Sequence, residues 1–120
     1  MNILPIFKTL QASPDVVALV NNRIYEDIAP NGTKFPYVIW SLVGGVPNHN
    51  LDCPPKIDHL TYQLVVYDIE RARASEIRKA ISVVLDPLCT ITNLHPNHVE
   101  RIADTNIFGR GFDANWWFDR

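Results

Sequence analysis

The sequence predicts an α+β fold, in which helices pack on one face of an antiparallel sheet and a long hairpin arm extends from it. Three observations support this prediction. Residues 59–68 alternate between apolar and polar side chains, as in a strand with one buried face, and residues 70–85 repeat their apolar side chains at helical spacing. The strand-like segments are grouped before and after that helix, which is typical of α+β proteins.

Two short helices are expected at the amino end. Residues 3–10 carry apolar side chains at three- and four-residue spacing, as on one side of a helix. A second helix begins after Ser13, whose hydroxyl can cap it. Pro14 suits the first helical position and Asp15 suits the positive end of the helix. Asn21-Asn22 ends it.

Three strand candidates follow. Residues 23–28 form a short one, and Ala-Pro-Asn-Gly at 29–32 is a turn by its residue chemistry. Residues 36–43 (PYVIWSLV), which include Trp40, are apolar on both faces. They suit a central strand, or one whose second face meets another molecule. In the third candidate, residues 59–68, the alternation predicts a buried face of Leu60, Tyr62, Leu64 and Val66.

Residues 44–57 connect these two strands and hold two glycines and three prolines. Proline cannot donate to a strand ladder, so we expect this segment not to continue the ladder of either strand. A connection this long is uncommon inside a compact domain and is often functional. We interpret it as a protruding β-hairpin arm, with a surface loop as the alternative. The candidate interface residues on it are Pro47, His49, Leu51, Pro54 and Pro55.

The main helix is expected at residues 70–85, with Asp68 near its start and Pro87 preventing its continuation. Its apolar stripe consists of Ala74, Ile77, Ile81, Val84 and Leu85. The basic side chains of Arg71 and Arg78 lie on other faces, where a solvated surface or an electrostatic contact with a neighbouring subunit is expected.

The carboxyl-terminal part gives weaker signals. Residues 89–94 and 99–104 are strand candidates, and Gly-Arg-Gly at 109–111 marks a turn. A final strand is expected at 115–119. There Trp116 and Trp117 must point to opposite faces, so one large aromatic side chain is expected at an interface. A strand covered on both faces is the alternative.

The sequence offers no catalytic constellation. His95 and His98 could approach each other, with His49 or Cys53 joining them, but the spacing of specific zinc motifs is missing. We therefore expect polar loop histidines, no metal and no cofactor. Cys89 follows the end of the main helix, where the helix dipole disfavours a thiolate, so a buried, unreactive thiol is expected.

Composition excludes further classes of protein. The formal net charge of −2 argues against a dedicated nucleic-acid binder. No apolar stretch approaches the roughly 20 residues that a membrane-spanning helix needs. The amino terminus lacks the pattern of a secretory signal, so synthesis in the cytoplasm is expected, with both cysteines unpaired.

Several segments together resemble the phage tail-completion proteins. The segments that carry the resemblance are DVVALV at 15–20, RIY at 23–25, AP at 29–30, FPYVIW at 35–40, YQLVVYD at 62–68 and the helix at 74–85. The resemblance covers roughly residues 10–85. This family is often described as head–tail joining proteins and is similar in role to the lambda-like tail terminators.

The resemblance implies a single tail-completion domain over residues 1–120 that is a structural protein and not an enzyme. Its subunits would form a ring, expected to be a hexamer, on the head-proximal end of the tail tube. The implied partners are the chain itself, the tail tube protein and a head-completion or connector protein, in the virion and, during assembly, in the host cytoplasm. The alternatives are a small metal- or thiol-dependent enzyme, and an interaction module of a tail-like secretion or injection machine.

Overall fold

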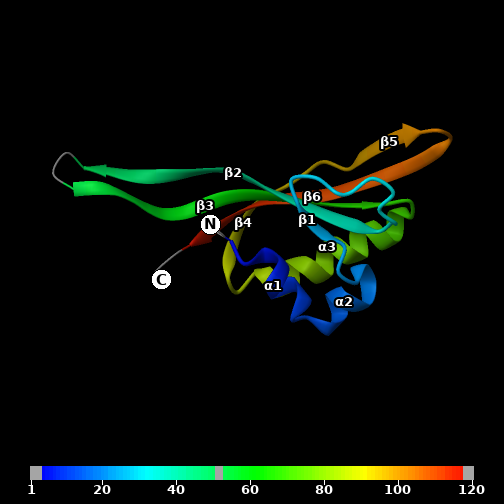
Figure 1. Ribbon diagram of the computed structural model, residues 1–120, viewed down its shortest axis with the longest axis horizontal. Coiled ribbons are helices and arrows are strands. Elements are labelled where there is room, and N and C mark those ends of the chain that lie inside the picture. Colours follow the sequence, from blue (N-terminus) through cyan, green and yellow to red (C-terminus); the bar gives the residue numbers. More distant parts are fainter. Residues whose placement is uncertain (1–3, 51–52, 118–120) are drawn as a thin grey trace.

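The chain folds into a sheet with all three helices on one of its faces (Figure 1). The computed structural model describes residues 4–50 and 53–117, and side chains within this part except those of residues 45–59 and Trp117. The elements are α1 (Ile6–Gln11), α2 (Pro14–Val20), β1 (Ile24–Glu26), β2 (Tyr37–Asn50), β3 (Cys53–Asp68), α3 (Arg71–Leu85), β4 (Cys89–Leu94), β5 (His98–Ile102) and β6 (Thr105–Trp117). This arrangement confirms the predicted α+β class.

The strands lie in the order β1-β2-β3-β6-β4, and β5 pairs with β6 along the same edge as β4. Neighbouring strands are antiparallel, as predicted, except for β1, which runs parallel to β2. The connection 27–36 carries the chain back before β2 starts, so that Ile24 pairs with Val38. A tight hairpin between these strands would have forced the antiparallel direction.

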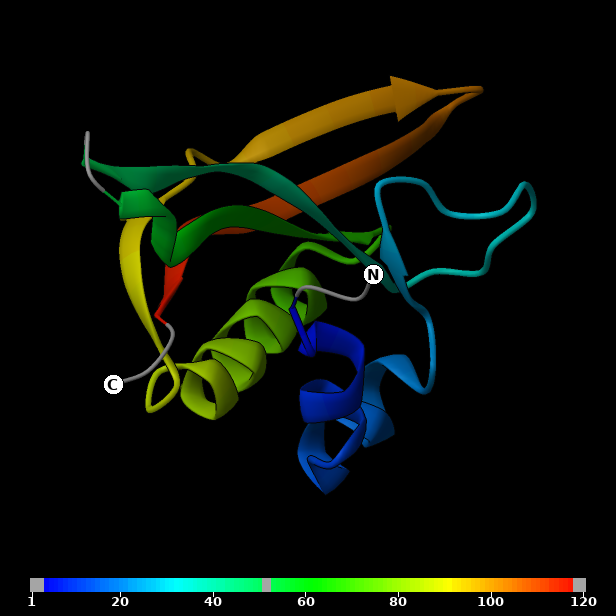
Figure 2. The same cartoon turned by 60° about the vertical axis from the view of Figure 1, so that its left-hand side comes forward.

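The core lies between the sheet and the helices. Leu60, Tyr62, Leu64 and Val66 of β3 are buried, as the alternation of the sequence predicts. The stripe of α3 that covers them consists of Ala74, Ile77, Ile81 and Leu85, all fully buried. Each large apolar side chain in such a position contributes roughly 1.5–3 kcal/mol relative to an exposed one. Figure 2 shows α3 lying across this face of the sheet, with α1 and α2 beside it.

The helix starts follow the signals in the sequence. The Ser13 hydroxyl accepts a hydrogen bond from the Val16 backbone N–H at 3.4 Å, with Pro14 at the first position of α2. At α3, buried Asp68 accepts hydrogen bonds from the backbone N–H groups of Ile69 at 2.7 Å and Glu70 at 3.3 Å. Asp68 thus fixes the chain just before α3, and its carboxylate also binds the Arg73 side chain in the first turn of the helix.

The segment 44–57 forms the predicted hairpin arm, but the expectation that it interrupts the ladder was wrong. Strand β2 continues to Asn50 and β3 begins at Cys53, with irregularities of register between Leu42 and Gly44 and at two further places. Bulges of this kind absorb extra residues without ending the pairing. Most of the arm has no third strand beside it, so a proline can point its nitrogen away from the ladder. The hairpin arm extends well past the helices (Figure 1).

The predicted turn at 109–111 was also wrong, because these residues lie in the middle of the long strand β6. The turn that precedes β6 instead uses Ala103 and Asp104, both with positive φ, as expected for a tight hairpin. Gly111 meets a different need. A Cβ atom there would lie 2.6 Å from the carbonyl oxygen of Leu64 on β3, so close packing of the backbone requires glycine.

Candidate interaction surfaces

The described residues contain no group of three or more histidine, cysteine, aspartate or glutamate side chains placed to hold a metal. His95 and His98 both line a hollow on the sheet. The His95 Nε2 lies 2.7 Å from Asp113 Oδ1, and this pair fixes the imidazole above Gly111. Within the same part of the chain, no helix has the length and apolar character needed to cross a bilayer.

Cys89 is buried, as the sequence predicts. The Tyr62 hydroxyl lies 3.2 Å from its sulfur, and the thiol donates to the Leu85 carbonyl oxygen at 3.1 Å, at the end of α3. Burial raises the pKa of the thiol above its ordinary value of 9.0. The Asp86 carboxylate raises it further, and the hydrogen bond with Tyr62 offsets part of the increase. A thiol in this state is a poor nucleophile.

We expect Cys89 to resist thiol reagents in the folded protein. A Cys53→Ser variant leaves it as the single thiol, and its reaction with Ellman's reagent at pH 8 should be slow until urea unfolds the chain. Folding raises the pKa of the Cys89 thiol above 9.0, so the buried, protonated thiol contributes its full stabilisation of the fold below pH 9.0. This stabilisation is lost as the pH rises through the raised pKa. The Cys53→Ser/Cys89→Ala variant gives the baseline. Equal reaction rates with and without urea would contradict the burial of this thiol.

The face of the sheet opposite the helices carries a row of aromatic side chains. The rings of Phe35 and Tyr37 lie 5.3 Å apart, and those of Tyr37 and Tyr67 lie 5.5 Å apart. Beside this row is a hollow of about 250 Å³, lined in part by His95 and Gly111. Burial is the main cause that raises the pKa values of both tyrosines. Because no helix covers this face, it is available for contact with another molecule.

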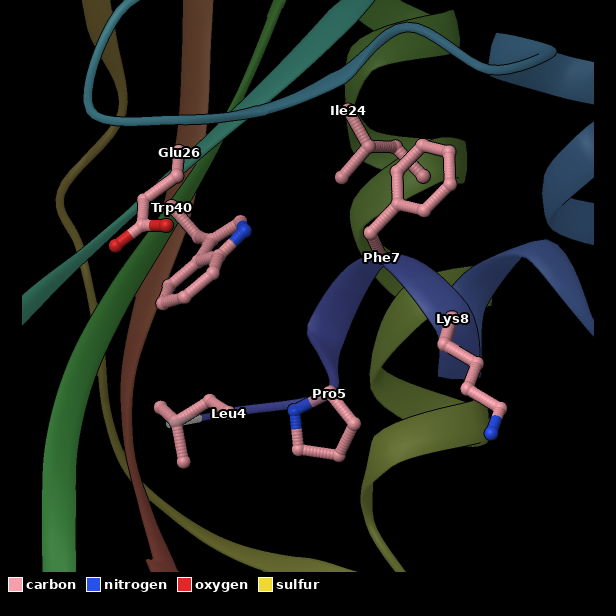
Figure 3. Close-up of a pocket in the computed structure, with 7 residues that line it drawn as sticks. All are labelled: Leu4, Pro5, Phe7, Lys8, Ile24, Glu26 and Trp40. Atoms are coloured by element: carbon pink, nitrogen blue, oxygen red, sulfur yellow. The ribbon is translucent and has the colours of Figure 1, made fainter. Parts of the chain in front are cut away.

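Trp40, a predicted interface residue, lies almost entirely within the core. Only 6% of its surface is exposed, and it forms one wall of a pocket of about 220 Å³ between α1 and strands β1 and β2. Figure 3 shows the Trp40 indole on one side of this pocket, with Phe7 and Lys8 on the other and Glu26 close to the indole. The double-faced apolar strand is therefore covered on its Trp40 face, while Ile39 lies on the uncovered face.

Arg71 and Arg78 of α3 place positive charges near a third arginine, Arg110 of β6. Arg71, a predicted interface residue, is exposed, and Arg78, another, is half-buried. Between α3 and the sheet lies Arg110, which is only 2% exposed. Its Nε donates to the Ser75 hydroxyl at 3.2 Å and its Nη1 donates to the Gly109 carbonyl oxygen at 3.0 Å. Arg110 was not predicted as a site residue, because its two flanking glycines indicate a turn when only the sequence is known.

The other predicted interface residues lie on the hairpin arm and at the end of β6. Pro47 pairs with Ile57 across the arm, and Leu51 lies outside the described residues. The structure places the backbones of His49, Pro54 and Pro55 in the two strands of the arm. At the end of β6, half-buried Trp116 packs against the core, and the backbone of Trp117 pairs with that of His59. The structure thus brings the arm and the end of β6 to neighbouring parts of β3 and leaves Arg71 and Arg78 on α3.

Comparisons with known proteins identify the family. A search of curated proteins finds no match. The fold is similar to a chain in the virion of a native gene transfer agent particle, with a TM-score of 0.56 and 18% identity over 93% of this chain and 91% of that one. It is also similar to the gp17 protein of bacteriophage SPP1, with a TM-score of 0.57 and 12% identity over 96% and 86% of the two chains. The profile of the family "Tail completion protein gp17" matches residues 5–101, and the chain therefore belongs to the tail-completion gp17 family.

Proposed function

We propose that this tail-completion protein forms a ring, expected to be a hexamer, that closes the head-proximal end of a tail tube and joins the tail to the head. Its family makes it a structural protein of the virion tail that associates with other virion proteins. We further propose that the partners of the ring are the tail tube protein and a head connector. Assembly in the host cytoplasm and the absence of catalysis are also proposed. Residues 1–120 would act in it as one tail-completion domain.

The single observation that carries the ring is that the two edges of the sheet present different surfaces. One edge is the three-residue strand β1, which ends at exposed Glu26 and is followed by exposed Asp27, and the other edge consists of β4 and β5. Subunits of a closed ring meet head to tail, so each needs two unlike contact surfaces. The hairpin arm supplies a third surface, which can reach the tube or a neighbouring subunit. We also propose that Trp116 or Trp117 contributes an aromatic side chain beside it, as the sequence predicts.

Electron microscopy of particles produced with and without the chain tests this function. With the chain present, tails should have one length and carry heads. Without it, tube polymerisation should lack a stop, giving tubes of variable length that do not join heads. Supplying the chain from a plasmid should restore both properties. Uniform tails joined to heads in the absence of the chain would overturn the proposal.

A further inference from the structure

Arg110 is a buried charge without a partner of opposite charge. Among the described residues, no carboxylate lies within ion-pair distance of its guanidinium, whereas Arg73 pairs with Asp68 and Arg101 pairs with Asp104. The two recorded hydrogen bonds of Arg110, to Ser75 and Gly109, use two of its five N–H groups. A buried cation in this condition is unfavourable unless an anion is supplied to it.

We propose that Arg71, Arg78 and Arg110 form a site, here called the arginine site, that takes a carboxylate from a second copy of this chain. The donor is the pair Glu26–Asp27, here called the acidic edge, at the other side of the neighbour's sheet. The inference rests on the proposed ring and specifies one contact within it.

The geometry of the arginine site favours an incoming anion. Arg71 and Ser75 are one helical turn apart and Arg78 follows three residues later, so all three lie along one side of α3. Ser75 contacts Arg110 directly. Burial lowers the pKa of Arg110, and the positive charges of Arg78 and Arg71 lower it further, so the three guanidiniums repel one another. A carboxylate placed among them would relieve this repulsion and accept hydrogen bonds from the remaining N–H groups of the guanidiniums.

The acidic edge is held in place by its backbone. The Asp27 N–H donates to the Trp40 carbonyl oxygen at 2.9 Å, and the Ile28 N–H donates to the Glu26 carbonyl oxygen at 2.7 Å. Asp27 has a φ of 68°, so the chain turns sharply here and presents both side chains to solvent. Within the described residues neither carboxylate forms an ion pair. The acidic edge at β1 and the arginine site on α3 and β6 therefore each lack a charge partner of opposite sign among the described residues.

Apolar side chains beside each site complement the charges. Ile28, next to the acidic edge, is 78% exposed. Beside the arginine site, the Phe108 ring centroid lies 5.9 Å from the Arg110 guanidinium carbon, and Val99 pairs with Phe108 on β5 and is 52% exposed. Cross-strand partners point to the same face, so these two side chains and Arg110 share one surface. Each of the two sites thus has an apolar area next to its charges, as the core of a protein interface does.

A nucleic-acid phosphate is the other anion that arginines bind. Binding to the phosphates of duplex DNA depends on an excess of positive charge, whereas the chain carries a net charge of −2. This charge balance favours the carboxylate, and DNA binding becomes an outcome of the test.

The test measures assembly of the purified full-length chain by mass photometry and electron microscopy. The chain is measured alone at its highest soluble concentration and after addition to isolated tail tubes that were made without the chain. Arg78→Glu and Glu26→Arg should each weaken assembly by about tenfold or more, because like charges then meet. One chain carrying both changes should recover most of the loss. Lys79→Glu, the same charge change at the adjacent exposed position, is the matched control and should assemble normally. Arg110→Met should assemble poorly while its melting temperature stays equal to or above that of the unchanged chain.

The outcomes separate the two proposals. Normal assembly of Arg78→Glu and Arg110→Met, or failure of the double charge exchange to recover any assembly, would overturn the arginine site and leave the ring intact. Binding of a duplex oligonucleotide that Arg78→Glu abolishes while assembly is unchanged would identify phosphate as the ligand instead. Absence of any ring from the unchanged chain, both alone and on tubes, would overturn the ring and the inference together.

Discussion

Replacing residues 48–56 of the hairpin arm with Asn-Gly is expected to give a folded subunit that no longer controls tail length. The change keeps the pairing of Pro47 with Ile57 and closes it with a two-residue turn that suits a tight hairpin. The helix-covered core begins at Leu60 and is left untouched, so the melting temperature should change little. The arm would lose its reach beyond the helices, and tails assembled with this variant should be long, variable and without heads.

Circular dichroism and electron microscopy check the two parts of this prediction. Gly44→Ala, at the base of the arm, is the control. An added Cβ there meets no atom within 4 Å, so this variant should fold and complete tails normally. If the shortened variant completes tails as well as Gly44→Ala does, the arm has no part in tail completion.

Asp68→Ala is expected to lower the free energy of unfolding by roughly 2–4 kcal/mol, through loss of several hydrogen bonds to a buried charged group. The carboxylate is fully buried, accepts from two backbone N–H groups, and binds Arg73 through Nε at 2.6 Å and Nη2 at 2.7 Å. Urea unfolding followed by tryptophan fluorescence measures the change. Because Asp68 anchors the start of α3, the same variant should also assemble poorly through misplacement of Arg71 and Arg78.

Glu70→Gln provides the comparison for Asp68→Ala. Glu70 also contacts Arg73, at 3.4 Å, but its side chain is 66% exposed. Exposed ion pairs contribute about 0–1 kcal/mol, so this variant should unfold close to the unchanged chain. Similar stabilities of Asp68→Ala and Glu70→Gln would show that the buried carboxylate does not hold the start of α3.

The parts of the fold that follow from local patterns were predicted from the sequence. The alternation through Leu60 and Tyr62 identified the buried face of β3, and the helical repeat identified the stripe of α3. Ser13 and Asp68 act at helix starts as their chemistry indicates. These signals arise from neighbours along the chain, so they can be recognised without knowledge of the tertiary structure.

The errors arose where distant contacts decide the structure. Gly111 resembles a turn residue, but it is required by the approach of the Leu64 carbonyl oxygen from another strand. Proline residues in the arm suggested an end to the ladder, whereas bulges and free edges allow it to continue. The direction of β1 depends on the path of residues 27–36. Arg110 became a candidate only once its burial and lack of a carboxylate were known.

Outside the hairpin arm, the two outer edges of the sheet expose little strand that could recruit further chains by backbone pairing. Strand β1 has three residues, and the opposite edge is divided between β4 and β5 by Pro96, which has no N–H to offer. Long, flat edges template open-ended polymers, and short or interrupted ones suppress them. In the proposed ring, recognition between copies would be left to side chains, whose complementarity would be satisfied once the ring is closed. A subunit that adds once and stops growth, as proposed for this chain, would benefit from edges that resist endless stacking.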